Sequence, residues 1–143
     1  MNKLKFQVKL SYRVELFGTG FYEGLSSQYN KKYPELSKKL DKYASHEYQH
    51  SKLFNKCYSD LFGKVLGAEG FWRGFGKCQS YLILVLPLKL KLKMASITEV
   101  LAVKQLEKDI ATGQKNKYTE IAKKIIPEEK KHAEIYKEWI SAL

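Results

Sequence analysis

Two short motifs constrain this chain more than any other feature: Glu47-x-x-His50 and Glu129-x-x-His132. In each motif the glutamate and the histidine are three residues apart, so on a helix both side chains point to one face. Both motifs also lie within runs of apolar residues at helical spacing, which would bury them. A buried carboxylate is costly unless it is paired or bound to a metal. The two motifs therefore predict helices that turn a polar, metal-binding face toward their own core.

Helical spacing predicts four long helices, over about residues 9–29, 34–62 and 95–112 and from residue 117 onward. In each helix, residues at steps of three and four form a continuous seam. The seam of the second helix is the clearest, and it consists of Leu36, Leu40, Tyr43, Glu47, His50, Phe54, Cys57 and Leu61. Pro34 suits the first position of that helix, and Pro127 is expected to kink or restart the fourth helix. The pattern indicates an all-α fold in one domain, residues 1–143.

Two further glutamates lie in the seams of the helices that lack a motif. Glu15 falls in the seam of the first helix and Glu99 in that of the third. Glu23 lies off the seam of the first helix and is a weaker ligand candidate. Glu107 and Asp109 lie on other faces, among lysines, and are expected to be solvated. The predicted metal ligands are Glu15, Glu47, His50, Glu99, Glu129 and His132.

Four carboxylates and two imidazoles suit two iron or manganese ions, because hard oxygen ligands neutralise the charge and one nitrogen caps each metal. Zinc is less natural with so many carboxylates. The alternative is a buried, hydrogen-bonded polar network without metal, in which the burial of four uncompensated carboxylates would be very costly. One such motif arises easily by chance. Two motifs in separate helices, with a seam glutamate in each remaining helix, are much more specific.

The net charge of +11 suggests an anionic partner, either nucleic acid or a membrane surface. A basic helical bundle that binds nucleic acid or membrane would explain the charge but not the four seam glutamates, so nucleic acid is not expected as a partner. Cys57 and Cys78 form no CxxC pair and are expected to be free thiols. Residues 1–10 contain no apolar segment of a secretory signal, and no apolar run reaches the length of about 18–20 residues that spans a bilayer.

The segment of residues 63–94 does not show the pattern of an ordinary bundle helix. It carries no acid between Glu69 and Glu99, yet it contains several lysines and the aromatic residues Phe71, Trp72, Phe75 and Tyr81. Residues 88–94 alternate apolar residues with lysine, which by itself fits a β-like segment. Two interpretations stay open: a segment lying in a membrane interface, or a packed connector. The glycines of the first helix likewise indicate either a weak helix, or close packing or room for a ligand.

The order of these ligands along the chain resembles that of the ferritin-like superfamily, whose four-helix bundles hold two metal ions. In detail the chain resembles the demethoxyubiquinone hydroxylase family of di-iron monooxygenases. Arg13-Val14-Glu15, followed by Gly18 and Tyr22, is similar to the pattern of that family's first helix. His50-x-x-x-Phe54 and the gap of 52 residues from Glu47 to Glu99 are similar to its later segments.

The resemblance implies an enzyme that uses dioxygen and two ferrous ions to hydroxylate the ring of a demethoxyubiquinol in ubiquinone biosynthesis. Glu47 and Glu129 would bridge the irons and Glu15 and Glu99 would be terminal ligands, so these four carboxylates form the expected catalytic set. The resemblance further implies a ferritin-like four-helix bundle with a long, partly membrane-associated connector between the second and third helices. Contact through about residues 71–94 would place the enzyme peripherally on the membrane, at the cytoplasmic face of a bacterial inner membrane or its equivalent.

Four residues are expected near the quinol: Gly18, which would leave room for the ring, Tyr22, Trp72 and Phe75. Ordinary packing in the seam is the alternative for Tyr22. The rival enzyme is a rubrerythrin-like peroxidase or ferroxidase, which needs no lipid segment. The lack of an acid at Val103, four residues after Glu99, counts against it. The sequence leaves open the electron donor and whether the chain forms a homo-oligomer.

Overall fold

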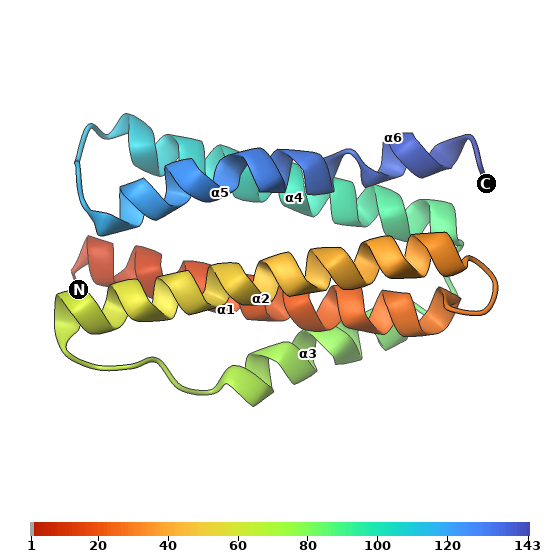
Figure 1. The fold of residues 1–143 in the computed structure, drawn as a ribbon, viewed down its shortest axis with the longest axis horizontal. Helices are drawn as coiled ribbons and strands as arrows, with labels where there is room; N and C mark the ends of the chain where they lie inside the picture. Colours follow the sequence, from red (N-terminus) through yellow and green to blue (C-terminus); the bar gives the residue numbers. More distant parts are fainter. Residues whose placement is uncertain (1) are drawn as a thin grey trace. The chain divides into compact units, whose positions relative to one another are not determined.

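A computed structural model describes residues 2–143, which form two compact helical units, one ending at Leu84 and the other beginning at Val85. The first unit contains α1 (Lys3–Tyr29), α2 (Pro34–Phe62) and α3 (Glu69–Leu82), and the second contains α4 (Leu88–Ala111), α5 (Lys117–Ala133) and α6 (Ile135–Ile140), as Figure 1 shows. Residues 2–143 contain no strand. The all-α prediction is confirmed.

Helices α1 and α2 form an antiparallel hairpin (Figure 1). Pro34 begins α2, and Gly63 ends it with a left-handed φ of 69°, which glycine adopts without steric cost. Ser26 and Ser37 join the two helices near their turn through hydroxyl oxygens 2.7 Å apart. The predicted seam of α2 is buried except at its end, where Leu61 is 37% exposed.

Helix α1 begins at Lys3, earlier than the predicted start near residue 9. The side chain of Asn2 accepts a hydrogen bond from the backbone N–H of Lys5 at 3.3 Å, so this residue caps the helix. Val8, one turn further, is fully buried. The prediction missed this turn because its lysines and apolar residues alternate.

Helix α3 lies inside the segment that was expected to be a connector, and it packs on α1 through glycines. A Cβ atom at Gly20 would lie 1.8 Å from the carbonyl oxygen of Arg73, and one at Gly76 would lie 1.9 Å from that of Phe17. Gly24 approaches Ser80 equally closely. The two backbones are therefore nearly in contact, which confirms close packing as the role of Gly20 and Gly24.

In the second unit, α4 begins at Leu88, directly after Pro87, and not at residue 95 as predicted. The β-like segment that the alternation of leucine and lysine suggests is therefore wrong, because these residues are helical. Lys91 and Leu92 are both buried, whereas Leu90 is 42% exposed, as the period of a helix requires. A buried lysine in the first turns of α4 made the apolar face hard to recognise.

Helices α4 and α5 form the second hairpin, which turns at Gly113 with a φ of 76°. Asn116 and Thr119 form a reciprocal capping box at the start of α5. The expectation that Asp109 is solvated is wrong, because it is only 6% exposed and accepts a hydrogen bond from the hydroxyl of Tyr118 at 2.7 Å. This buried bond ties the two helices together beside their turn.

Helix α5 continues through Pro127 and ends at Ala133, so of the two expected outcomes the restart at the proline is wrong and the kink stays a prediction. The break falls instead at Glu134, and α6 follows it. Within residues 2–143 no helix combines the length and the apolar character that crossing a membrane requires. Membrane association of residues 71–94 stays a prediction.

Candidate metal centre

The first unit brings together three of the predicted ligands, which we call the first cluster: Glu15 of α1 and Glu47 and His50 of α2. One ligand atom from each residue lies within 4.8 Å of the other two. Nδ1 of His50 is 3.4 Å from Oε2 of Glu15. All three side chains are buried, with no residue more than 6% exposed. The motif on α2 and the lone glutamate on α1 therefore meet as the seams predict.

The second unit repeats this arrangement in the second cluster: Glu99 of α4 and Glu129 and His132 of α5. One ligand atom from each again lies within 4.8 Å of the others. Nδ1 of His132 is 3.9 Å from Oε1 of Glu99 and 3.7 Å from Oε2 of Glu129. Their exposed fractions are 7%, 2% and 1%. In both clusters the histidine turns Nδ1 toward the glutamate of the neighbouring helix.

Each cluster has the ligand atoms and the excess negative charge of a metal site. Two carboxylates about 4 Å apart repel each other by roughly 4 kcal/mol at the effective dielectric constant of a protein surface. A divalent cation removes that repulsion, and carboxylate oxygen with imidazole nitrogen is a ligand set that iron accepts. The two clusters together offer four carboxylates and two imidazoles, which fits two iron ions.

A glycine gives the carboxylate of Glu47 its space. A Cβ atom at Gly18 would lie only 3.1 Å from Oε2 of Glu47, tighter than ordinary contact. One residue further along α1, the hydroxyl of Thr19 donates to the backbone carbonyl of Glu15 at 2.8 Å. The sequence had marked Gly18 as a place for a substrate ring. The structure places it against a predicted ligand.

The other residues predicted to meet a substrate lie at different depths of the first unit. Tyr22 is 2% exposed and packs edge-on against Tyr43, with ring centroids 5.7 Å apart. On α3, Trp72 is half-buried under the guanidinium of Arg13, which lies 5.2 Å from its ring. Phe75 is 48% exposed. Tyr22 thus belongs to the interior and Phe75 to the surface.

A polar network that the sequence did not predict attaches the start of α3 to α2. The hydroxyl of Tyr48 donates to Oε1 of Glu69 at 2.8 Å, and this hydrogen bond, more than Lys52, lowers the pKa of Glu69. Arg73 donates from Nε to Glu23 of α1 at 3.2 Å, which raises the pKa of its guanidinium. Arg73 also lies 5.1 Å from the ring centroid of Tyr48. Tyr48, the chain neighbour of Glu47, therefore links α3 to α2, and Glu23 links it to α1.

A comparison with known protein families bears on both the fold and the candidate metal centre. The family described as Rubrerythrin matches residues 7–140, which include all six predicted ligands and most of each unit. The chain belongs to the Rubrerythrin family. No curated protein and no solved structure matches the chain.

Membership in the Rubrerythrin family confirms the predictions of a ferritin-like fold and of two iron ions as cofactor. Proteins of this family are usually di-iron oxidoreductases. The match gives no support to the demethoxyubiquinone hydroxylase family in particular. The resemblance in Arg13-Val14-Glu15 and His50-x-x-x-Phe54 therefore reflects the wider superfamily as well as it does that one branch.

Proposed function

We propose that the two clusters hold two iron ions and that the protein reduces hydrogen peroxide, as a rubrerythrin-like oxidoreductase. The observation that carries this proposal is the repeated cluster. In each unit a lone glutamate and a Glu-x-x-His motif come from two packed helices and are buried, within a chain that matches the Rubrerythrin family from residue 7 to residue 140.

The bound irons would supply the electrons for the chemistry, because reduction of one hydrogen peroxide to two waters takes up two electrons and two protons. The residues of the chain would hold and tune the metal pair. Glu15, Glu47 and His50 would hold iron in the first unit, and Glu99, Glu129 and His132 would hold it in the second. Burial of all four carboxylates keeps bulk water away, which strengthens each interaction between ligand and metal.

Iron analysis and peroxide consumption test this function directly. Protein purified without oxygen and loaded with ferrous iron should contain two irons per chain and consume one peroxide for every two ferrous ions. Consumption should be independent of lipid. Protein that takes up no iron, or iron-loaded protein that leaves peroxide untouched, would refute the proposal. Oxidation of excess ferrous iron by dioxygen, measured in the same preparation, separates a ferroxidase from a peroxidase.

A quinol monooxygenase is the second candidate, and the outward face of α3 favours it. Phe71 is 65%, Phe75 48% and Leu82 69% exposed, while Lys77 is also exposed, as in a helix that lies on an anionic lipid surface. We propose that such an enzyme would dock through about residues 71–94 on the cytoplasmic face of a membrane and accept a quinol. Flotation with anionic vesicles and turnover of a demethoxyubiquinol are required. Failure of either measurement removes this candidate.

A further inference from the structure

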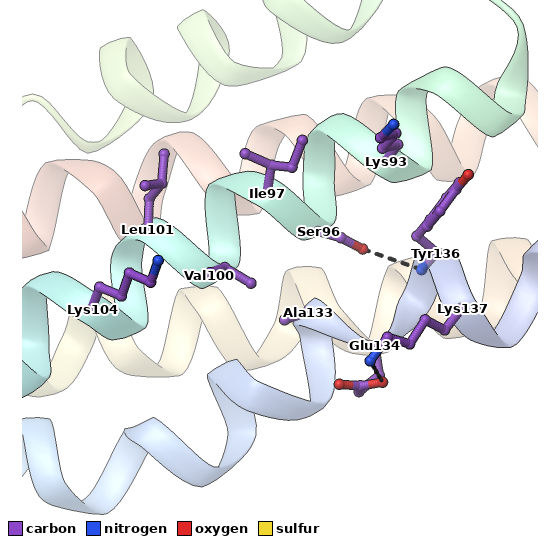
Figure 2. A pocket seen from close by; sticks show the side chains of 10 residues that line it. All are labelled: Lys93, Ser96, Ile97, Val100, Leu101, Lys104, Ala133, Glu134, Tyr136 and Lys137. Atoms are coloured by element: carbon purple, nitrogen blue, oxygen red, sulfur yellow. Dashed lines mark hydrogen bonds and ion pairs between the residues drawn. The ribbon is translucent and has the colours of Figure 1, made fainter.

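A groove in the second unit lies between α4 and the junction of α5 with α6 (Figure 2). It encloses about 380 Å³. The backbone N–H of Tyr136 donates to Oγ of Ser96 at 3.2 Å, so α6 is fixed to α4 at one end of the groove. A second hollow of about 340 Å³ shares Val100 and Ala133 with the first and extends the groove as far as Glu107.

The floor of the groove is apolar and exposed. Ile97 is 51%, Val100 42% and Leu101 60% exposed. These residues continue a stripe that begins with Leu90 and Met94, with steps of four, three and four from Leu90 to Leu101. This is the spacing by which a helix packs against apolar side chains of another protein.

Cations dominate the rim of this apolar floor. Both carboxylates of the groove already face lysines: Glu134 lies 3.4 Å from Lys137, and Glu107 lies 3.1 Å from Lys130. Within residues 2–143, Lys93 and Lys104 have no ion-pair partner, and both line the groove (Figure 2). They are 11 residues apart on one helix, a span of about 16 Å.

The groove lies directly behind the second cluster. Val100 and Ala133 line it, and they are the chain neighbours of the ligands Glu99 and His132. Glu99 and His132 are buried on the other faces of the same two helices. Because consecutive Cα atoms are about 3.8 Å apart, the distance from groove to ligand is at most about one helix diameter, roughly 10–12 Å. An electron can tunnel over such a distance through packed protein.

Electrons for the reaction must come from outside these residues. The 143 residues contain two cysteines, both free thiols, which are too few for a four-cysteine iron centre. Peroxide reduction consumes two electrons in each turnover. We propose that the groove is the docking site of an acidic electron-carrier protein, whose apolar residues contact Ile97 and Leu101 and whose carboxylates face Lys93 and Lys104. This inference rests on the proposed function.

Charge distinguishes this occupant from a second copy of the chain. Each copy carries a net charge of +11 and presents the same unpaired lysines, so two copies repel each other at this face. An acidic protein is attracted to it and approaches faster at low ionic strength. The docked carrier would pass one electron at a time to the irons, so two carriers are oxidised for every peroxide reduced.

The test uses a small acidic [2Fe–2S] ferredoxin as the probe. Binding to the metal-free and the iron-loaded protein is measured by calorimetry at low ionic strength, and the rise in visible absorbance as the reduced ferredoxin is reoxidised reports electron transfer. The double variant Lys93→Glu, Lys104→Glu should weaken binding and slow electron transfer by about tenfold or more. Leu101→Ser, at an exposed position, should weaken binding about fivefold. The rate at which dithionite reduces the bound irons should be unchanged in both variants, because dithionite needs no docking site.

The matched control is Lys123→Glu, Lys124→Glu, which makes the same charge change on an exposed part of α5 outside the groove. An equal loss in the control, or no binding of ferredoxin to the unaltered protein, would overturn the inference. So would a dimer that Leu101→Ser converts to a monomer, since the groove would then join two copies. Ferrous-loaded protein that leaves peroxide untouched would refute the proposed function, while the binding measurements would still decide the docking site.

Discussion

The two clusters hold the same ligands in different surroundings. In both, a lone glutamate meets a Glu-x-x-His motif, and Nδ1 of the histidine faces that glutamate. Three residues after the lone glutamate stands Gly18 in the first unit but Ala102 in the second, and seven residues after it stand Tyr22 and Leu106. The comparison teaches that holding metal is common to both units, whereas the space and polarity beside the metal are not.

The helices that pack around each hairpin differ even more between the two units. The first unit carries α3, fixed to α1 through glycines, and the second carries α6 and an open groove. The two units therefore share the ligand types and differ in what packs around them. Four predictions test this comparison.

The largest expected effect is on iron binding, which should depend equally on the two Glu-x-x-His motifs. Glu47→Ala and Glu129→Ala should each reduce bound iron from two ions per chain to at most one. Each should also abolish the stabilisation by iron, about 2.7 kcal/mol when free iron is a hundred times its dissociation constant. Metal analysis and thermal unfolding with and without iron measure both effects.

The metal-free protein provides the control for these two variants. Without iron, removal of one buried carboxylate relieves repulsion, so both variants should unfold at the same or a higher temperature than the parent. A variant that leaves both irons bound would show that only one cluster holds metal.

The glycine interface of the first unit should be the next most sensitive feature. Gly20→Ala forces a methyl group against the carbonyl oxygen of Arg73 and should cost roughly 3 kcal/mol of unfolding free energy. Gly74→Ala, in α3, meets no atom within 4 Å and should stabilise the helix by up to about 1 kcal/mol. Urea denaturation distinguishes the two. Equal effects would mean that α3 does not pack on α1 in this way.

Exchanging the residues three positions after each lone glutamate tests the difference between the clusters. Gly18→Ala should displace the carboxylate of Glu47 by a few tenths of an ångström and weaken iron binding about tenfold. The reverse exchange, Ala102→Gly, should lower stability by about 1 kcal/mol and leave iron binding unchanged. Iron titrations of both variants measure this difference in iron affinity. If both weaken binding equally, the clusters have equivalent surroundings.

Acid should loosen α3 in a way that has no counterpart in the second unit. The hydrogen bond from Tyr48 lowers the pKa of Glu69 in the folded protein. Its stabilising effect is therefore complete above the unfolded pKa of about 4.3 and is lost as pH falls through the lower, folded value. Fluorescence of Trp72 in an acid titration follows the release. Tyr48→Phe should move this transition to higher pH, and an unchanged midpoint would contradict the assignment.

Sequence reasoning predicted the elements that rest on apolar periodicity. The limits of α2 were right because Pro34 and Gly63 punctuate an unbroken seam. The burial of the six predicted ligands also followed from the seams, since a seam acid faces the core of its own hairpin, whereas their individual roles at the metals stay a prediction. Helix α3 was missed because glycines, not apolar residues, make its contact with α1. Asp109 was misjudged because its partner Tyr118 lies beyond the turn, outside the pattern of its own helix.

The backbone contact between α1 and α3 also leads to an expectation about other members of the family. Any side chain at Gly20, Gly24 or Gly76 would collide with the opposite helix. These three glycines and their spacing therefore form a fingerprint that can be sought in other sequences of the Rubrerythrin family. Family members that carry it should possess a third helix held as closely as this one. Those with larger residues at these positions must hold that segment further away or lack it.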